Sequence, residues 1–123
     1  MSVQRPMTGD VMVFQLEEER ERIGDLAPGE SGGRNARALL KSGPLRVTLV
    51  ALAPGGATSE HQAEGPITIQ PIHGRIRFKS ESGDRELGPG ELLLAGPGLR
   101  HAVTSDECAA FLLTIVKPGD SSA

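Results

Sequence analysis

The chain has 123 residues, thirteen of them basic and sixteen acidic, so its formal net charge is −3. This length fits one domain, because single hydrophobic cores typically hold about 100–150 residues. The lack of a basic block and the near absence of aromatic residues argue against nucleic-acid binding. No apolar run approaches the roughly 20 residues that span a bilayer, so we expect a soluble protein with no membrane partner.

The single cysteine, Cys108, cannot form an internal disulfide, and residues 1–14 lack the apolar region of a signal peptide. Cytoplasm is therefore the expected compartment. No cationic residue adjoins Cys108 in the sequence to favour its thiolate. We therefore expect a small packed residue rather than a nucleophile.

The run from residue 10 to residue 25 is rich in strong helix formers, and Leu16 and Ile23 lie seven apart, on one helical face. This pattern predicts a short helix resting on the rest of the fold. The charged residues Glu17–Arg22 would form its solvated face. The alternative is that residues 11–14 begin a strand.

After a loop rich in Pro, Gly and Ser at residues 26–34, strand patterns repeat every eight to ten residues, as in an all-β sandwich or barrel. Residues 45–53 are apolar on both faces in their second half, so their outer face needs cover from a partner subunit or from the N-terminal helix. Pro71 indicates a bulge or an edge position. The expected strands are 36–41, 45–53, 67–72, 75–80, 85–88, 91–95, 100–104 and 108–117.

Two stretches, residues 54–74 and 88–101, each open with a Pro/Gly turn and carry a histidine at a matching place. A strand-turn-strand unit joins them. The pattern predicts two strand pairs of one barrel, with His61 and His101 aimed at one cavity.

These stretches resemble the paired motifs of the cupin superfamily, G-x5-H-x-H-x3,4-E-x6-G and G-x5-P-x-G-x2-H-x3-N. The motif's second histidine, glutamate and asparagine are replaced by Ala63, Ile67 and Ser105, so two of the four usual metal ligands are missing. Pro97 lies one residue from the motif's proline. The positions that match are Gly55, His61, Gly74, Gly90, Gly98 and His101.

The resemblance covers about residues 45–116. It implies a small RmlC-like cupin: an antiparallel jelly-roll β-barrel, or double-stranded β-helix, with a short N-terminal helix, and commonly a homodimer. The domain organisation that follows is an N-terminal arm with its helix at 1–34, the cupin barrel at 35–117 and a polar tail at 118–123.

In such a barrel the motif histidines line an open cavity. The alternation of side chains along a strand puts Ala63 on the same face as His61, and the family spacing puts Ile67 and Ile69 inward. The predicted floor is aliphatic and suits a small, mostly apolar ligand, with Thr58 and Ser59 as further polar candidates. The expected pocket residues are His61, Ala63, Ile67, Ile69, Gln70 and His101.

A catalytic zinc or non-haem iron site usually has three protein ligands, and His61 and His101 supply two. Glu64 is the best candidate for the third, because a shift of its turn would return its carboxylate to the barrel mouth. Weaker candidates are Glu60, Gln70 and His73. The expected cofactor is one divalent transition metal, namely iron, manganese, nickel or zinc, or none.

Several functions stay open. The barrel could bind a small molecule or a metal ion through His61 and His101, without catalysis. It could be a dioxygenase- or isomerase-like enzyme that uses this pair with Glu64, or the two imidazoles could divide acid and base roles without a metal. It could also be a structural dimer. The roles of Asn35 and Arg37, which precede the barrel, are left open between a ligand contact and a surface contact.

Overall fold

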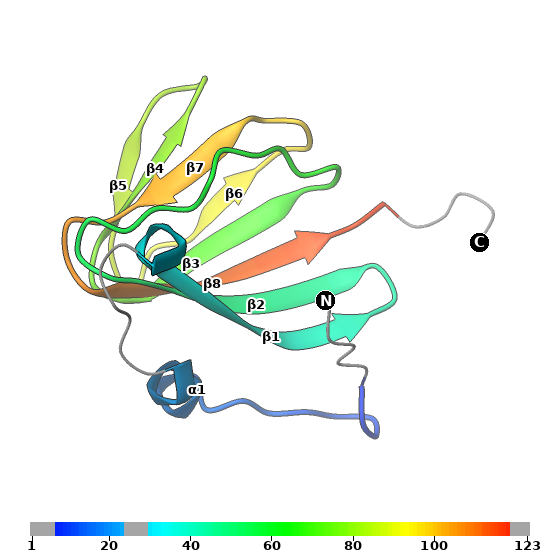
Figure 1. Ribbon diagram of the computed structural model, residues 1–123. Coiled ribbons are helices and arrows are strands. Elements are labelled where there is room, and N and C mark those ends of the chain that lie inside the picture. Colours follow the sequence, from blue (N-terminus) through cyan, green and yellow to red (C-terminus); the bar gives the residue numbers. More distant parts are fainter. Residues whose placement is uncertain (1–6, 24–29, 119–123) are drawn as a thin grey trace.

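A computed structural model describes residues 7–23 and 30–118, which form two facing antiparallel sheets (Figure 1). One sheet has the strand order β1-β2-β8-β3-β6 and the other β5-β4-β7. The jelly-roll prediction is therefore confirmed. The strands are β1 (Arg34–Ser42), β2 (Leu45–Leu52), β3 (Ile67–His73), β4 (Ile76–Ser80), β5 (Arg85–Leu87), β6 (Leu93–Ala95), β7 (His101–Thr104) and β8 (Ala109–Val116).

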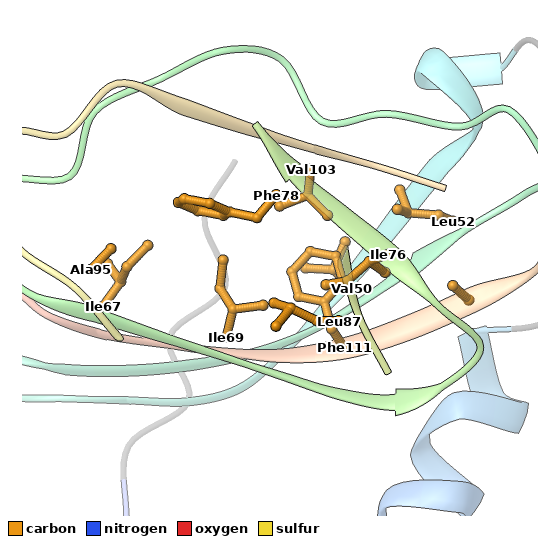
Figure 2. Packing of buried hydrophobic residues seen from close by; sticks show 11 residues of the cluster. Val50, Leu52, Ile67, Ile69, Ile76, Phe78, Leu87, Ala95, Val103 and Phe111 are labelled. Atoms are coloured by element: carbon orange, nitrogen blue, oxygen red, sulfur yellow. The ribbon is translucent and has the colours of Figure 1, made fainter. Parts of the chain in front are cut away.

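The core lies between the two sheets. Figure 2 shows Phe78 and Val103 of the three-stranded sheet facing Ile69 and Phe111 of the five-stranded sheet. The strict alternation of apolar and polar residues in β4 places Phe78 inward, as predicted, because neighbouring side chains of a strand point to opposite faces. All four side chains are almost fully buried.

The outer face of β2 is covered by the N-terminal part of the same chain. Val50 and Leu52 point into the core, whereas Leu49 and Ala51 point outward, and all four are buried. Helix α1 (Leu16–Ile23) contacts β1 and β2 from this outer side (Figure 1). The apolar outer face therefore does not require a second copy, and the homodimer stays a prediction.

Helix α1 is shorter than the sequence predicted. Residues 10–15 form neither helix nor strand, and their exposure alternates: Val11 and Val13 are exposed, whereas Met12 and Phe14 are partly buried. An extended segment can bury every second side chain in this way, and β-branched valines lower helix propensity. The predicted helical residues 24 and 25 lie outside the described part of the chain.

The prediction that Glu17–Arg22 is a solvated face is wrong at Glu19. The Glu19 side chain is buried, with one carboxylate oxygen 2.5 Å from Arg37 Nε and the other 2.8 Å from Arg22 Nη1. A buried carboxylate requires such partners. The contact from Arg37 holds α1 against the edge strand β1, so this arginine has an intramolecular role.

Pro71 occupies a place where a missing N–H is tolerated. The pairing of β3 with β8 shifts register between Pro71 and His73, and β6 pairs with β3 only from Ile67 to Ile69. Pro71 thus lies beside a bulge, as one of the two predicted explanations requires, and beyond the last β6 partner of the inner strand β3.

The structure differs from two further predictions, which concern Cys108 and the loop at residues 26–34. Cys108 is exposed rather than packed, because β8 begins one residue later, at Ala109. Within the predicted loop 26–34, residues 26–29 lie outside the described part; Glu30–Gly33 form a 3-10 turn and Arg34 already belongs to β1.

Within residues 7–23 and 30–118, no helix is both long and apolar enough to cross a membrane.

Candidate functional site

The segment from residue 57 to residue 61 lies along the free edge of β7 and brings the two motif histidines together. Thr58 N–H donates to the Val103 carbonyl at 2.9 Å. His61 and His101 then exchange two backbone hydrogen bonds, each 2.9 Å long. Side chains at such directly opposed positions point to the same face. As a result, the two imidazole centroids lie 4.4 Å apart in an edge-to-face arrangement.

Both imidazoles are anchored through the same ring nitrogen. His61 Nδ1 lies 2.9 Å from the Ser59 carbonyl oxygen, and His101 Nδ1 lies 3.0 Å from the Leu99 carbonyl oxygen. A carbonyl only accepts, so Nδ1 carries the proton in each neutral ring and Nε2 keeps its lone pair. Metal-binding histidines are usually held in this way, by a backbone or carboxylate acceptor on the other nitrogen.

The two rings differ in their access to solvent. His101 is only 2% exposed and stacks on Phe78 at a centroid distance of 5.3 Å, whereas His61 is exposed. Burial lowers the pKa of His101, and the neighbouring His61 lowers it further, although the hydrogen bond to Leu99 acts in the opposite direction. His101 is therefore neutral at pH 7.

A cavity of about 350 Å³ opens beside His61, between segment 58–61 and the inner face of β1, β2 and β8. This volume is near the lower end of the range of small-molecule pockets, roughly 300–1,000 Å³. Most of the lining surface is apolar, although several of the lining side chains are polar. The lining residues are Arg34, Asn35, Ala36, Thr48, Val50, Thr58, His61 and Leu113.

Of the six residues predicted to line the pocket, His61 lies on this cavity, and Thr58, a secondary candidate, joins it. Ile67 and Ile69 belong to the packed core, and Ala63 packs against it. Gln70 is exposed, because it alternates with the buried Ile69 along β3. His101 contacts the ring of His61.

The sequence analysis did not predict that residues of β1 and β2 form one wall of the cavity. One signal was available: Thr48 shares the inward face with Val50, and a hydroxyl at an inward position of a buried strand suggests a polar cavity. Arg34 and Asn35 could not be assigned in this way, because their contribution depends on β1 pairing with β2, with Arg34 opposite Leu52.

Among the described residues, no third side chain is placed to complete a metal site with His61 and His101. Glu64 is exposed, and the described residues contain no group of three His, Cys, Asp or Glu side chains placed to hold a metal ion. The donor set therefore fits a site with two imidazole ligands, and does not fit the three-ligand site typical of catalytic zinc or non-haem iron.

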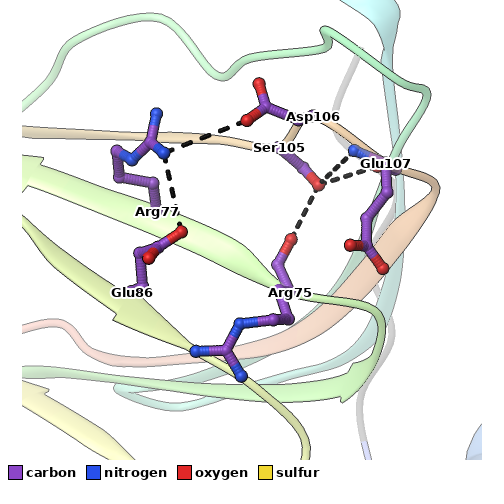
Figure 3. Close-up of polar contacts among 6 residues, drawn as sticks. All are labelled: Arg75, Arg77, Glu86, Ser105, Asp106 and Glu107. Atoms are coloured by element: carbon purple, nitrogen blue, oxygen red, sulfur yellow. Dashed lines mark hydrogen bonds and ion pairs between the residues drawn. The ribbon is translucent and has the colours of Figure 1, made fainter.

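Ser105 occupies the position of the motif asparagine, and its hydroxyl group stabilises the turn before β8. Its Oγ lies 2.7 Å from the carbonyl oxygens of Arg75 and Glu107 and accepts a hydrogen bond from Glu107 N–H (Figure 3). Beside it, Arg77 forms ion pairs with Glu86 and Asp106. Ser105 is buried in these contacts, so its role is structural.

No protein-family model and no curated protein matches the chain, but many solved structures do. A conserved protein of unknown function from Streptococcus pyogenes is 21% identical over 98% of each chain, with a TM-score of 0.74. A cupin superfamily protein from Desulfitobacterium hafniense DCB-2 is 17% identical over 75% of this chain and 84% of its own, with a TM-score of 0.67. An RmlC-like cupin with a double-stranded β-helix fold from Methanocaldococcus jannaschii is 10% identical over 74% of this chain and 86% of its own, with a TM-score of 0.64. The chain therefore has the small RmlC-like cupin fold that its motifs predicted.

Proposed function

We propose that this cupin-fold protein binds a small molecule in the cavity beside His61. The observation that supports the proposal is the orientation of the His61 ring: the Ser59 carbonyl accepts from Nδ1, so Nε2 is an acceptor at the edge of a cavity of about 350 Å³. A fixed imidazole of this kind selects ligands with a correctly placed hydrogen-bond donor. The buried ring of His101 contacts the His61 ring edge to face and so helps to hold it in place.

Binding of a divalent metal ion is a second candidate. Its support is that His101, like His61, keeps its Nε2 lone pair while Nδ1 is held by a carbonyl. Iron, nickel or zinc suits imidazole ligands, whereas manganese prefers oxygen ligands, and the remaining coordination positions would go to water or to a bound small molecule. A dioxygenase- or isomerase-like reaction would need a third protein ligand such as Glu64, but the described residues contain no group of three such side chains that could hold a metal ion.

Ligand binding is tested by recording the imidazole NMR signals of the purified protein against a library of small polar and apolar compounds. We expect at least one compound to shift the His61 signals and to lose this effect in the His61→Ala variant. The control is His73→Ala, which removes the one histidine outside the pair. A library that never moves the His61 signals would refute the proposal.

Elemental analysis of the same preparations tests the metal. Near-stoichiometric metal that persists in His73→Ala and disappears in a His61→Ala, His101→Ala double variant would support a two-imidazole site. Wild-type protein that holds no metal after incubation with excess divalent ions would end the metal candidate, while leaving small-molecule binding intact.

A further inference from the structure

The polar side chains that face the cavity include a hydrogen-bond donor whose orientation is fixed by the fold. Thr58 Oγ1 accepts the Val103 N–H at 2.9 Å and keeps its hydroxyl hydrogen to donate, and Thr58 lines the cavity. Asn35 also lines the cavity, but its side chain points to the opposite face of β1, because Asn35 pairs with the outward-pointing Ala51. This part of the wall therefore offers the Thr58 hydroxyl to whatever binds there.

The charge of the lining also favours a ligand that carries hydrogen-bond acceptors. Among the described residues that line the cavity, Arg34 is the one ionised side chain, and none is Asp or Glu. A guanidinium has five N–H donors in a planar fork, so it can serve a ligand in addition to a protein neighbour. A carboxylate accepts from such a fork with two oxygens. An amine ligand would meet like charge here, and a purely apolar ligand would displace water from these donors without offering them an acceptor.

His61 supplies a hydrogen-bond acceptor to the cavity, in contrast to these donors. Because its Nδ1–H is held by Ser59, Nε2 of the neutral ring can accept a hydrogen bond. A ligand that satisfies the whole lining must therefore carry an anionic acceptor group together with a separate donor. Inorganic phosphate satisfies the donors of the wall but lacks the apolar part that would cover Val50 and Leu113.

We propose that the ligand is a small hydroxy acid. Its carboxylate accepts from Arg34 and Thr58, its hydroxyl donates to His61 Nε2, and its carbon chain contacts the aliphatic residues. At roughly 30 Å³ for each water-sized group, a cavity of this size holds on the order of ten non-hydrogen atoms. This proposal rests on the proposed function, since it assigns a chemical class to the same site.

The test compares hydroxy acids with the alcohols in which a neutral hydroxymethyl group replaces each carboxylate. Lactate, glycerate and tartrate are titrated beside propane-1,2-diol, glycerol and threitol, with propionate and inorganic phosphate as further probes, and binding is followed by the NMR signals of His61 and the cavity amides. We expect at least one hydroxy acid to bind tenfold or more tightly than its alcohol and than propionate or phosphate.

The Arg34→Gln variant should remove this preference for the acid, whereas Arg85→Gln, an equal change of charge on the exposed strand β5, should keep it. Amide spectra of both variants establish that they fold. If neutral or apolar library compounds bind the cavity and no hydroxy acid does so more tightly, the ligand class is wrong but the proposed function stands. If no compound of either set shifts the His61 signals, both fail.

Discussion

The space between the two sheets contains two regions with opposite properties. Between β3 or β8 and the three-stranded sheet, Ile69, Phe78 and Phe111 fill the interior. Between β1 or β2 and segment 58–61, the facing residues include Ala36, Thr48 and Thr58, and a cavity remains. The same two-layer scaffold thus gives either a packed core or a binding site, according to the volume and polarity of the side chains that point inward.

The largest effect is expected from damage to the packed region. Phe111→Ala removes a ring that is 1% exposed, and it should lower the free energy of unfolding by about 3–5 kcal/mol. Leu113→Ala, two residues along the same strand, should cost less, because Leu113 is only partly buried and already borders the cavity. Urea unfolding of both variants measures the difference. Equal losses would contradict the distinction between the two regions.

A smaller effect is expected where the cavity wall is attached. A Cβ on Gly56 would lie only 2.4 Å from the Gly33 carbonyl oxygen, at the point where residues 53–57 pack on the turn before β1. Gly56→Ala should therefore destabilise the protein by about 1–3 kcal/mol through overpacking. It should also perturb the amide signals of Arg34 and Asn35.

Gly55→Ala is the matched control for this contact. Gly55 has a φ of +79°, but a Cβ there would meet no atom within 4 Å. The control reports only the cost of a left-handed backbone with a side chain, about 1–2 kcal/mol, and should leave the signals of β1 unchanged. Perturbation of β1 by Gly55→Ala would show that the close approach at Gly56 is not what positions the wall.

The smallest effect is a dependence on pH that separates the buried ring from the exposed one. Because the pKa of His101 in the folded protein lies below its ordinary value of 6.5, the unfolded chain binds the proton first as the pH falls. The free energy of unfolding should thus be unaffected by this group above about pH 6.5, decrease as the pH falls below it, and level off below the folded pKa.

Urea unfolding at pH 7.5 and pH 5.5 checks this prediction. His101→Asn should lose part of the decrease seen in the wild type, whereas His73→Ala should retain it. An identical pH dependence in the wild type and His101→Asn would show that the burial of His101 does not oppose its protonation.

Much of the fold followed from local patterns. The alternation in residues 75–80 predicted the inward Phe78, the apolar second half of β2 predicted burial on both faces, and Pro71 predicted a bulge or an edge. These features depend on neighbours along one strand. The helix prediction failed at residues 10–15, where the exposure of the side chains alternates as in an extended segment and the β-branched valines lower the helix propensity.

The chain's motifs, by themselves, determined the jelly roll and singled out two histidines. Only the tertiary structure decided which of them faces a cavity and what surrounds it. Arg34 and Asn35 reach the site because β1 pairs with β2, and Thr58 reaches it because its segment follows β7. A cavity is the volume that side chains from distant strands leave unfilled, so it depends on long-range register, which local sequence patterns do not contain.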